Sequence, residues 1–221
     1  MKKNVKVMLL CVTFGALFAC SEGDFDDSGT NSSSNNSGNA FVSPEAIDLG
    51  LPSGIKWASF NVGATKPEEY GGYYAWGETE EKSSYHQSNY LYYKNGSYIG
   101  IGYNISATQY DVAHIKLGGT WRMPTRNELS ELLNECTWVW TTLNSVNGYL
   151  VTGSNGNSIF LPATGFYNGD EVVFTTTSAC YRSSTLLKIT SFEPNSLFFN
   201  SKNFEWDWNN YYGYSVRPVC E

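Results

Sequence analysis

Aromatic side chains set the strongest limit on the structures that this sequence can adopt. Trp, Tyr and Phe make up 16% of its 221 residues, and the charged residues make up another 16%. Disordered chains are poor in aromatic residues and rich in charge, so we expect most of this chain to fold. A net charge of −7 disfavours binding to nucleic acid, and the presence of only two histidines excludes a His-rich metal site.

The first residues are expected to direct the protein to a membrane rather than to fold. Basic residues precede an uncharged, mostly apolar run at 7–19, which is shorter than the roughly 20 residues that span a bilayer. This pattern is typical of a signal peptide, and the letters LFAC at 17–20 resemble a bacterial lipobox. We therefore expect a signal peptide at 1–19 and lipidation of Cys20, with no other attachment to a membrane. An ordinary signal peptide with an incidental cysteine is the alternative.

Residues 20–40 predict a flexible tether. They begin with an acidic stretch and continue with Ser, Asn and Gly, which cannot bury apolar surface. The acidic stretch resembles signals that send lipoproteins of Bacteroides-like bacteria to the cell exterior, although a solvated tether explains it as well. The expected location is therefore the outer membrane, with the folded domain facing the exterior.

Residues 41–221 predict a single domain, long enough for one sizeable core. One helix is expected from Arg126 to Glu135 or Cys136, because Thr125 and Glu128 have the spacing of a capping box. Its apolar residues fall three and four positions apart on one face, at Leu129, Leu132 and Leu133.

The remaining pattern predicts short strands and long loops, which makes the fold class α+β. The clearest pair of strands is a hairpin of 148–152 and 158–161, with Asn155-Gly156 in its turn. The segment 61–120 shows no sustained periodicity, so we expect either a long aromatic loop or short elements that the pattern does not reveal. The other expected strands are 47–49, 56–60, 172–174, 180–184, 196–200, 204–208 and 214–219.

Seven short motifs together resemble one known family. They are DLGLPSG (48–54), KWA (56–58), NVGA (61–64), GGYYAWGE (71–78), GGTWRMPT (118–125), IFLPA (159–163) and YSVRPV (214–219). The chain is similar over 46–220 to the Fibrobacter succinogenes major paralogous domain, which is abundant in surface lipoproteins of gut Bacteroides. The resemblance implies a C-type-lectin-like fold, which has a small twisted antiparallel sheet, one or two helices and long loops. No enzymatic activity is established for that family.

Three cysteines of the domain, Cys136, Cys180 and Cys220, would lie in an oxidising compartment. One disulfide and one leftover thiol is the natural expectation there, and three free thiols are the alternative. The resemblance implies a Cys136–Cys220 disulfide, because C-type-lectin-like folds commonly link their helix region to the final strand.

Two arginines are expected to be structural, and a third departs from the pattern of the family. Arg122 and Arg217 lie inside the two strongest motifs, where a bidentate carboxylate partner would explain a half-buried guanidinium. Arg182 stands where many relatives have Trp, so its charge is expected to meet a carboxylate or water.

Two patterns could support catalysis or calcium binding, and both have simpler explanations. Asp111 precedes His114, but no nucleophile pattern such as Gly-x-Ser-x-Gly occurs, so we expect a packed histidine. The letters EPN at 193–195 resemble the calcium-binding tripeptide of sugar-binding C-type lectins, but the later WNN at 208–210 lacks the final carboxylate. We therefore expect no catalytic residues, no bound metal and no cofactor.

Aromatic residues in the loops form the expected binding surface, because their large rigid rings with polar groups suit stacking on sugars or contact with a protein. The candidate ligand-binding residues are Tyr92, Tyr93, Tyr211 and Tyr212. The predicted function is non-catalytic binding of a glycan or a protein partner at the cell surface. A structural or adhesive component of a surface assembly is the alternative, and an unrecognised hydrolase is a third.

Alternation at 204–209 predicts a half-buried strand. The apolar residues Phe204, Trp206 and Trp208 alternate with polar ones that supply a solvent face. We therefore predict that Trp206 and Trp208 belong to the core, and their display on a binding surface is the alternative.

Overall fold

The structure is a computed structural model that describes residues 42–188, 191–207 and 209–221. The expected signal peptide, the lipidated Cys20 and the tether therefore lie outside the described residues, as does Trp208. None of the described helices is long and apolar enough to cross a membrane.

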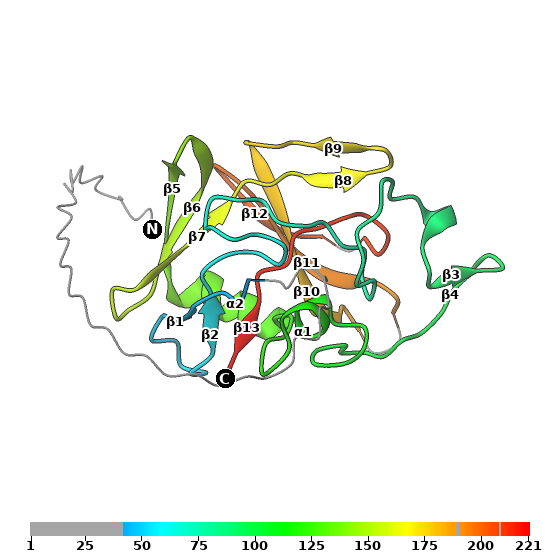
Figure 1. Ribbon diagram of the computed structural model, residues 1–221, viewed down its shortest axis with the longest axis horizontal. Coiled ribbons are helices and arrows are strands. Elements are labelled where there is room, and N and C mark those ends of the chain that lie inside the picture. The colour runs from blue at the N-terminus through cyan, green and yellow to red at the C-terminus, as the bar shows by residue number, and fades with distance from the viewer. Residues whose placement is uncertain (1–41, 189–190, 208) are drawn as a thin grey trace, which may run out of the picture. The chain divides into compact units, whose positions relative to one another are not determined.

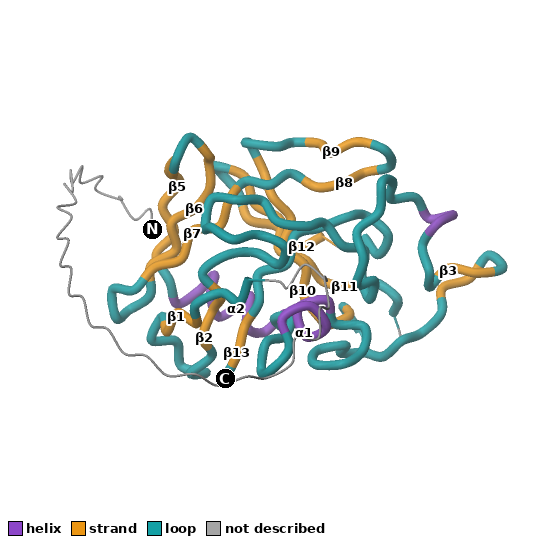
Figure 2. Tube along the Cα trace, in the orientation of Figure 1, coloured by secondary structure: helices purple, strands orange, loops and turns teal. Residues whose placement is uncertain are grey.

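The described residues form an α+β domain of small antiparallel sheets and two α-helices, as the sequence predicts (Figures 1 and 2). The helices are α1 (Val112–Leu117), α2 (Arg126–Glu135) and the 3-10 turn η1 (Gln87–Asn89). The strands are β1 (Ala46–Asp48), β2 (Lys56–Ala58), β3 (Tyr93–Lys94), β4 (Ser97–Tyr98), β5 (Thr137–Leu143), β6 (Val146–Thr152), β7 (Ser158–Pro162), β8 (Phe166–Asn168), β9 (Glu171–Val173), β10 (Ser178–Leu186), β11 (Pro194–Asn200), β12 (Phe204–Asp207) and β13 (Val219–Cys220).

Three three-stranded sheets surround the main core. Their strand orders are β1-β2-β13, β5-β6-β7 and β10-β11-β12. Leu129 and Leu132 of α2 pack into this core with Trp57 of β2 and Phe199 of β11, so all three sheets and the helix share one apolar interior. Figure 1 shows β5, β6 and β7 at one end of the domain, and the small β3–β4 hairpin at the other.

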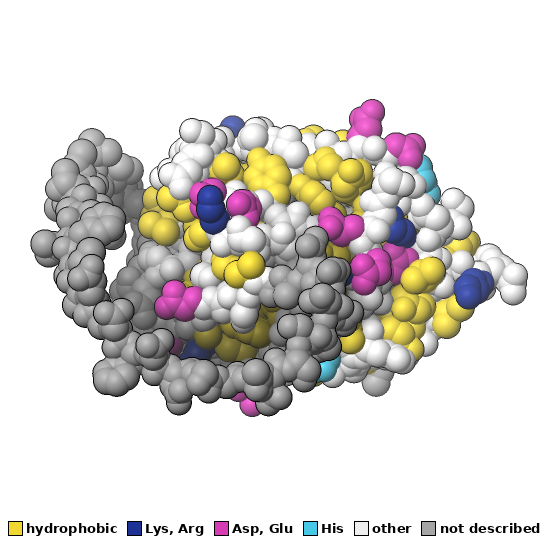
Figure 3. Space-filling view, viewed as in Figure 1, with side chains coloured by type: hydrophobic (Ala, Val, Ile, Leu, Met, Phe, Trp, Pro, Cys, Tyr) yellow, Lys and Arg dark blue, Asp and Glu magenta, His cyan; other side chains and the backbone are white. Residues whose placement is uncertain are grey.

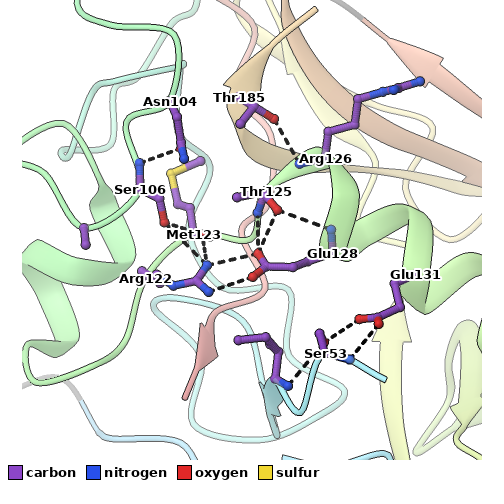
Figure 4. Close-up of polar contacts among 12 residues, drawn as sticks. Ser53, Asn104, Ser106, Arg122, Met123, Thr125, Arg126, Glu128, Glu131 and Thr185 are labelled. Atoms are coloured by element: carbon purple, nitrogen blue, oxygen red, sulfur yellow. Dashed lines mark hydrogen bonds and ion pairs between the residues drawn. The ribbon is translucent and has the colours of Figure 1, made fainter. Parts of the chain in front are cut away.

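The start of α2 is fixed by a local polar network (Figure 4). The Thr125 side chain accepts a hydrogen bond from the Glu128 backbone N–H, and the Glu128 carboxylate accepts one from the Thr125 backbone N–H. Arg122 donates to both oxygens of Glu128, at 3.0 and 2.6 Å, which confirms the carboxylate partner predicted for Arg122. Burial raises the pKa of Glu128, but the hydrogen bonds from Arg122 and Thr125 outweigh burial and lower it.

The carboxylate partner predicted for Arg217 is wrong. Its guanidinium is fully buried and donates to the Asn61 side-chain oxygen at 2.8 Å, the Ala58 carbonyl at 2.9 Å and the Phe160 carbonyl at 2.7 Å. Burial lowers the pKa of Arg217 to about 10. Arg217 therefore joins three segments that are distant in sequence, and it uses neutral acceptors to do so.

The Cys136–Cys220 disulfide that the family resemblance implied is not formed in the structure. Cys136, Cys180 and Cys220 are all free thiols. Cys136 packs at the edge of the main core, whereas Cys220 packs with Ala58 and Trp121 in a separate small cluster, so the two thiols have different neighbours.

Most predicted strands are present, with different ends. The hairpin is confirmed as β6 and β7, and β5, which the sequence did not indicate, extends the same sheet by pairing along its whole length with β6. The strand expected at 214–219 is mostly irregular, and only Val219 and Cys220 pair in a ladder. The segment 61–120 is largely loop and carries only short elements, namely η1, β3, β4 and α1.

Candidate ligand-binding site

The sheet β10-β11-β12 has one face toward the core and another toward the aromatic loops. In its register Trp206 lies opposite Leu197, and both pack with the main core, although Trp206 is only partly buried. Trp206 therefore packs against the core as predicted, but it stays partly exposed and also borders a cavity. The neighbouring pairs, Phe198 with Glu205 and Ser196 with Asp207, must then point to the other face, because side chains alternate along a strand.

Arg182 extends from β10 on this second face and holds the loop at 209–212. It is fully buried and donates to the backbone carbonyls of Asn209, of Asn210 at 3.5 Å and of Tyr212 at 2.7 Å. The guanidinium carbon also lies 4.0 Å from the centre of the Tyr214 ring. The carboxylate or water expected at Arg182 is thus replaced by carbonyls of a single loop, and burial lowers the pKa of Arg182 to about 10.

The 209–212 loop is also braced from within. The Asn209 side-chain oxygen accepts hydrogen bonds from the backbone N–H groups of Tyr211 and Tyr212, both at 3.1 Å. Asn210 is buried and donates from its side chain to the Phe192 carbonyl. The rings of Tyr211 and Tyr212 stand at 86° to each other, and each borders a different cavity.

The first cavity, which we name the Tyr211 pocket, has a volume of about 470 Å³. Its apolar wall contains Tyr211 and the stacked rings of Tyr98 and Phe192, whose centres lie 6.1 Å apart. Its polar lining residues are Gln87, Ser191, Glu193, Asn209 and Asn210. The Gln87 amide nitrogen donates to the Tyr98 hydroxyl at 2.9 Å, which fixes both side chains at the wall.

The second cavity, which we name the Tyr212 pocket, has a volume of about 270 Å³. Its aromatic wall comprises Phe166, Phe174, Phe198 and Tyr212. Phe166 is stacked on Tyr212 at 19° with ring centres 5.9 Å apart, and it also touches Phe174. Trp206 and two carboxylates, those of Glu205 and Asp207, complete the lining.

Phe174 has an unusual backbone for an aromatic residue. Its φ of 58° lies in the left-handed region, and 61% of the side chain is exposed. The Phe174 carbonyl accepts hydrogen bonds from the backbone N–H groups of Thr177 and Ser178, which hold this turn in place. A left-handed conformation costs of order 1–3 kcal/mol and persists only where the surroundings enforce it.

The Phe174 turn follows the β8–β9 hairpin directly. Figure 3 shows hydrophobic side chains gathered over this hairpin, with acidic side chains at its end. Phe174 is therefore an exposed aromatic residue with an unfavourable backbone conformation, and it borders a cavity that is lined by other aromatic rings.

The four tyrosines predicted as ligand-binding residues do not form one site. Tyr211 and Tyr212 border the two pockets. Tyr93 lies opposite Tyr98 across the β3–β4 hairpin, so it supports the wall of the Tyr211 pocket. Tyr92 packs edge-on against Tyr90 and Tyr110 and donates to the Gly77 carbonyl, so it belongs to the packing below the surface.

The other patterns noted in the sequence have structural roles. Asp111 caps α1, accepting hydrogen bonds from the backbone N–H groups of Ala113 and His114 and from two further N–H groups, and burial raises its pKa. The Asn195 side chain is buried and donates to the Thr185 carbonyl, while Glu193 borders the Tyr211 pocket. Among the described residues no three acidic, His or Cys side chains come together as a metal site would require.

Five residues that line the two cavities were not predicted from the sequence as site residues. They are Gln87, Phe166, Phe174, Phe192 and Phe198. Phe192 could have been found from one signal, since it is a lone aromatic residue in the polar stretch TSFEPN, whereas Phe174 follows two valines in an expected strand. Comparison with known proteins finds no family model, no curated protein and no solved structure that matches this chain. The family resemblance therefore stays a prediction.

Proposed function

We propose that this chain is a non-catalytic cell-surface lipoprotein whose C-type-lectin-like domain binds a glycan in the Tyr211 pocket. The observation that carries the proposal is the pairing of ring faces with amide and carboxylate groups in that one cavity. A sugar has apolar C–H faces, which stack on rings, and a rim of hydroxyls, which require fixed hydrogen-bonding partners. The volume of about 470 Å³ falls in the ordinary range for small-ligand pockets.

The first test is a glycan array followed by titration calorimetry, with the chain from Ser21 onward. The Tyr211→Ala and Gln87→Ala variants should each weaken a glycan hit by about tenfold, which corresponds to the loss of one well-placed contact. Tyr103→Ala is the matched control, because Tyr103 is 46% exposed and borders neither pocket. An array without hits, or equal effects of all three variants, would reject glycan binding at this pocket.

The anchor at Cys20 is a separate part of the proposal, and the lipobox-like sequence supports it. Metabolic labelling with palmitate should mark the wild-type chain and not a Cys20→Ser variant. Protease treatment of intact cells should remove the domain if it faces the exterior. Labelling that survives Cys20→Ser would contradict the anchor, and protection from protease would contradict the outward orientation.

A structural or adhesive role in a surface assembly is favoured by the edge strand β5. In the described part of the chain β5 pairs only with β6, and none of its seven residues is charged. Exposed Val139 lies directly opposite exposed Leu150 on the outer face. An edge strand without charged residues has free backbone N–H and C=O groups that can pair with a strand of another chain. Light scattering should then show self-association that Val139→Lys removes, and a monomer at every concentration would reject this role.

A further inference from the structure

The Tyr212 pocket differs from the Tyr211 pocket in the groups that line it. Rings form most of its wall, and its only charged groups among the described lining residues are the carboxylates of Glu205 and Asp207. We propose that the Tyr212 pocket is a second binding site, and that it takes an organic cation bearing an alkylated ammonium group.

The rings provide the first part of the argument. An aromatic ring carries negative electrostatic potential on its face, and several rings around one cavity therefore favour a positive ligand. Phe166 and Tyr212 are stacked with each other, and Phe174 is tilted at 42° to Phe166, so the three rings turn along one wall. Phe198 comes from β11 on the sheet side of the cavity.

The charges provide the second part. Glu205 lies opposite Phe198 in the sheet and is exposed, and its carboxylate has no hydrogen bond or ion pair with the described residues. Asp207 accepts a hydrogen bond from the Tyr214 hydroxyl and keeps its carboxylate at the cavity. An anionic ligand would face two like charges here, whereas a cation would meet both carboxylates and the ring faces together.

Two basic side chains lie near this wall. The guanidinium carbon of Arg126 lies 4.8 Å from the centre of the Trp206 ring, which borders the cavity. The other basic side chain is Arg182. Its guanidinium is fully buried against the Tyr214 ring and donates to carbonyls of the 209–212 loop. Its charge acts inside the fold and partly offsets that of Asp207, whereas Glu205 and Phe174 are the exposed residues of the lining.

The strain at Phe174 gives the site a fixed shape. The backbone of Phe174 is fixed in this turn by the N–H groups of Thr177 and Ser178 before any ligand arrives, so binding does not have to order the turn. The cavity volume of about 270 Å³ suits a compact group such as trimethylammonium. Both free choline and a trimethylated lysine side chain carry that group.

The decisive experiment compares choline with 3,3-dimethylbutan-1-ol, which has the same shape and no charge. Titration monitored by NMR or calorimetry, with the chain from Ser21 onward, should show choline binding at least about tenfold more tightly. A trimethyllysine peptide forms a second arm, and the tighter of the two cations identifies the source of the group. Equal binding of choline and its neutral analogue, or binding of neither cation, would overturn the proposal.

Variants then locate the site. Glu205→Gln should weaken choline binding by about fivefold or more, because it removes a charge without changing the size of the side chain. Glu171→Gln is the matched control, since Glu171 is exposed and does not border the cavity. Both variants should unfold at the wild-type temperature. Equal effects of Glu205→Gln and Glu171→Gln would show that only the net charge matters and would reject the site.

Discussion

The start of α2 and the 209–212 loop are both fixed by an arginine, but in opposite ways. Arg122 binds a carboxylate six residues further along the chain, within one short segment. Arg182 binds carbonyls that lie 27 to 30 residues away, and none of its hydrogen-bond acceptors in the described part of the chain is a carboxylate oxygen. The helix is therefore secured by a local ion pair, whereas the binding loop depends on a buried charge from another strand.

The comparison predicts the largest loss of stability for Arg182→Met. This change leaves the carbonyls of Asn209 and Tyr212 without their donor, and each buried polar group without a partner costs about 1–3 kcal/mol. We expect the free energy of unfolding to fall by roughly 3–5 kcal/mol in urea denaturation, a loss typical of breaking a buried charge network. A loss no larger than that of Arg122→Met would contradict the difference drawn between the two arginines.

Arg122→Met should cost less, about 1.5–3 kcal/mol, because it removes hydrogen bonds to one charged group. The Arg122 and Glu128 side chains retain 15% and 14% of their exposure, so water can still reach Glu128. A double-mutant cycle with Glu128→Gln should give a clear coupling energy, because the two side chains contact each other. Arg122→Met with Thr152→Ala serves as the control pair and should be additive, since no hydrogen bond joins these two residues.

The same ion pair predicts a dependence of stability on pH. The pKa of Glu128 in the folded state lies below its ordinary value of 4.5, so the pair contributes stability above that pH. This contribution is lost as the pH falls through the lowered pKa. Glu128→Gln should therefore be less stable than the wild type at pH 7, and the two unfolding curves should converge as the pH falls from about 5 toward 2. A gap that is constant with pH would rule out this role of Glu128.

The smallest expected effect is a gain of stability in the loop region. Phe174→Asn places a residue that tolerates the left-handed region at φ 58°, and should raise the free energy of unfolding by up to about 1 kcal/mol. The same variant should weaken choline binding, because it removes a ring from the Tyr212 pocket. Phe192→Asn is the control, as Phe192 is also exposed but does not have a positive φ. A loss of stability in the Phe174→Asn variant would show that the Phe174 ring stabilises the fold by packing against its neighbours, and that it is not simply an exposed ring available to a ligand.

Contacts between residues close in sequence could be predicted, whereas contacts between distant segments could not. The helix α2, its capping box and the partner of Arg122 depend on residues within a few positions of one another, and all three are confirmed. The partners of Arg182 and Arg217 are mostly backbone carbonyls of distant segments, which any residue type can supply. Tyr211 and Tyr212 could be proposed as ligand contacts from their residue type. The sequence could not show that they border two different cavities, because each cavity is built from distant segments. Strand β5 escaped prediction because its alternating Trp and Thr residues carry no charge to mark a solvent face.

Tyr211 and Tyr212 are adjacent in sequence, and this determines how binding at one cavity affects binding at the other. One residue step separates the rings, and the loop that carries both is clamped by Arg182 and by Asn209. Any shift of this loop on binding at one cavity must alter the other, and thermodynamic linkage requires the same factor in both directions. A rigid clamp keeps that factor close to one. Two different ligands could then be held at once by neighbouring residues, so that a molecule carrying both chemical groups would gain avidity from a single domain.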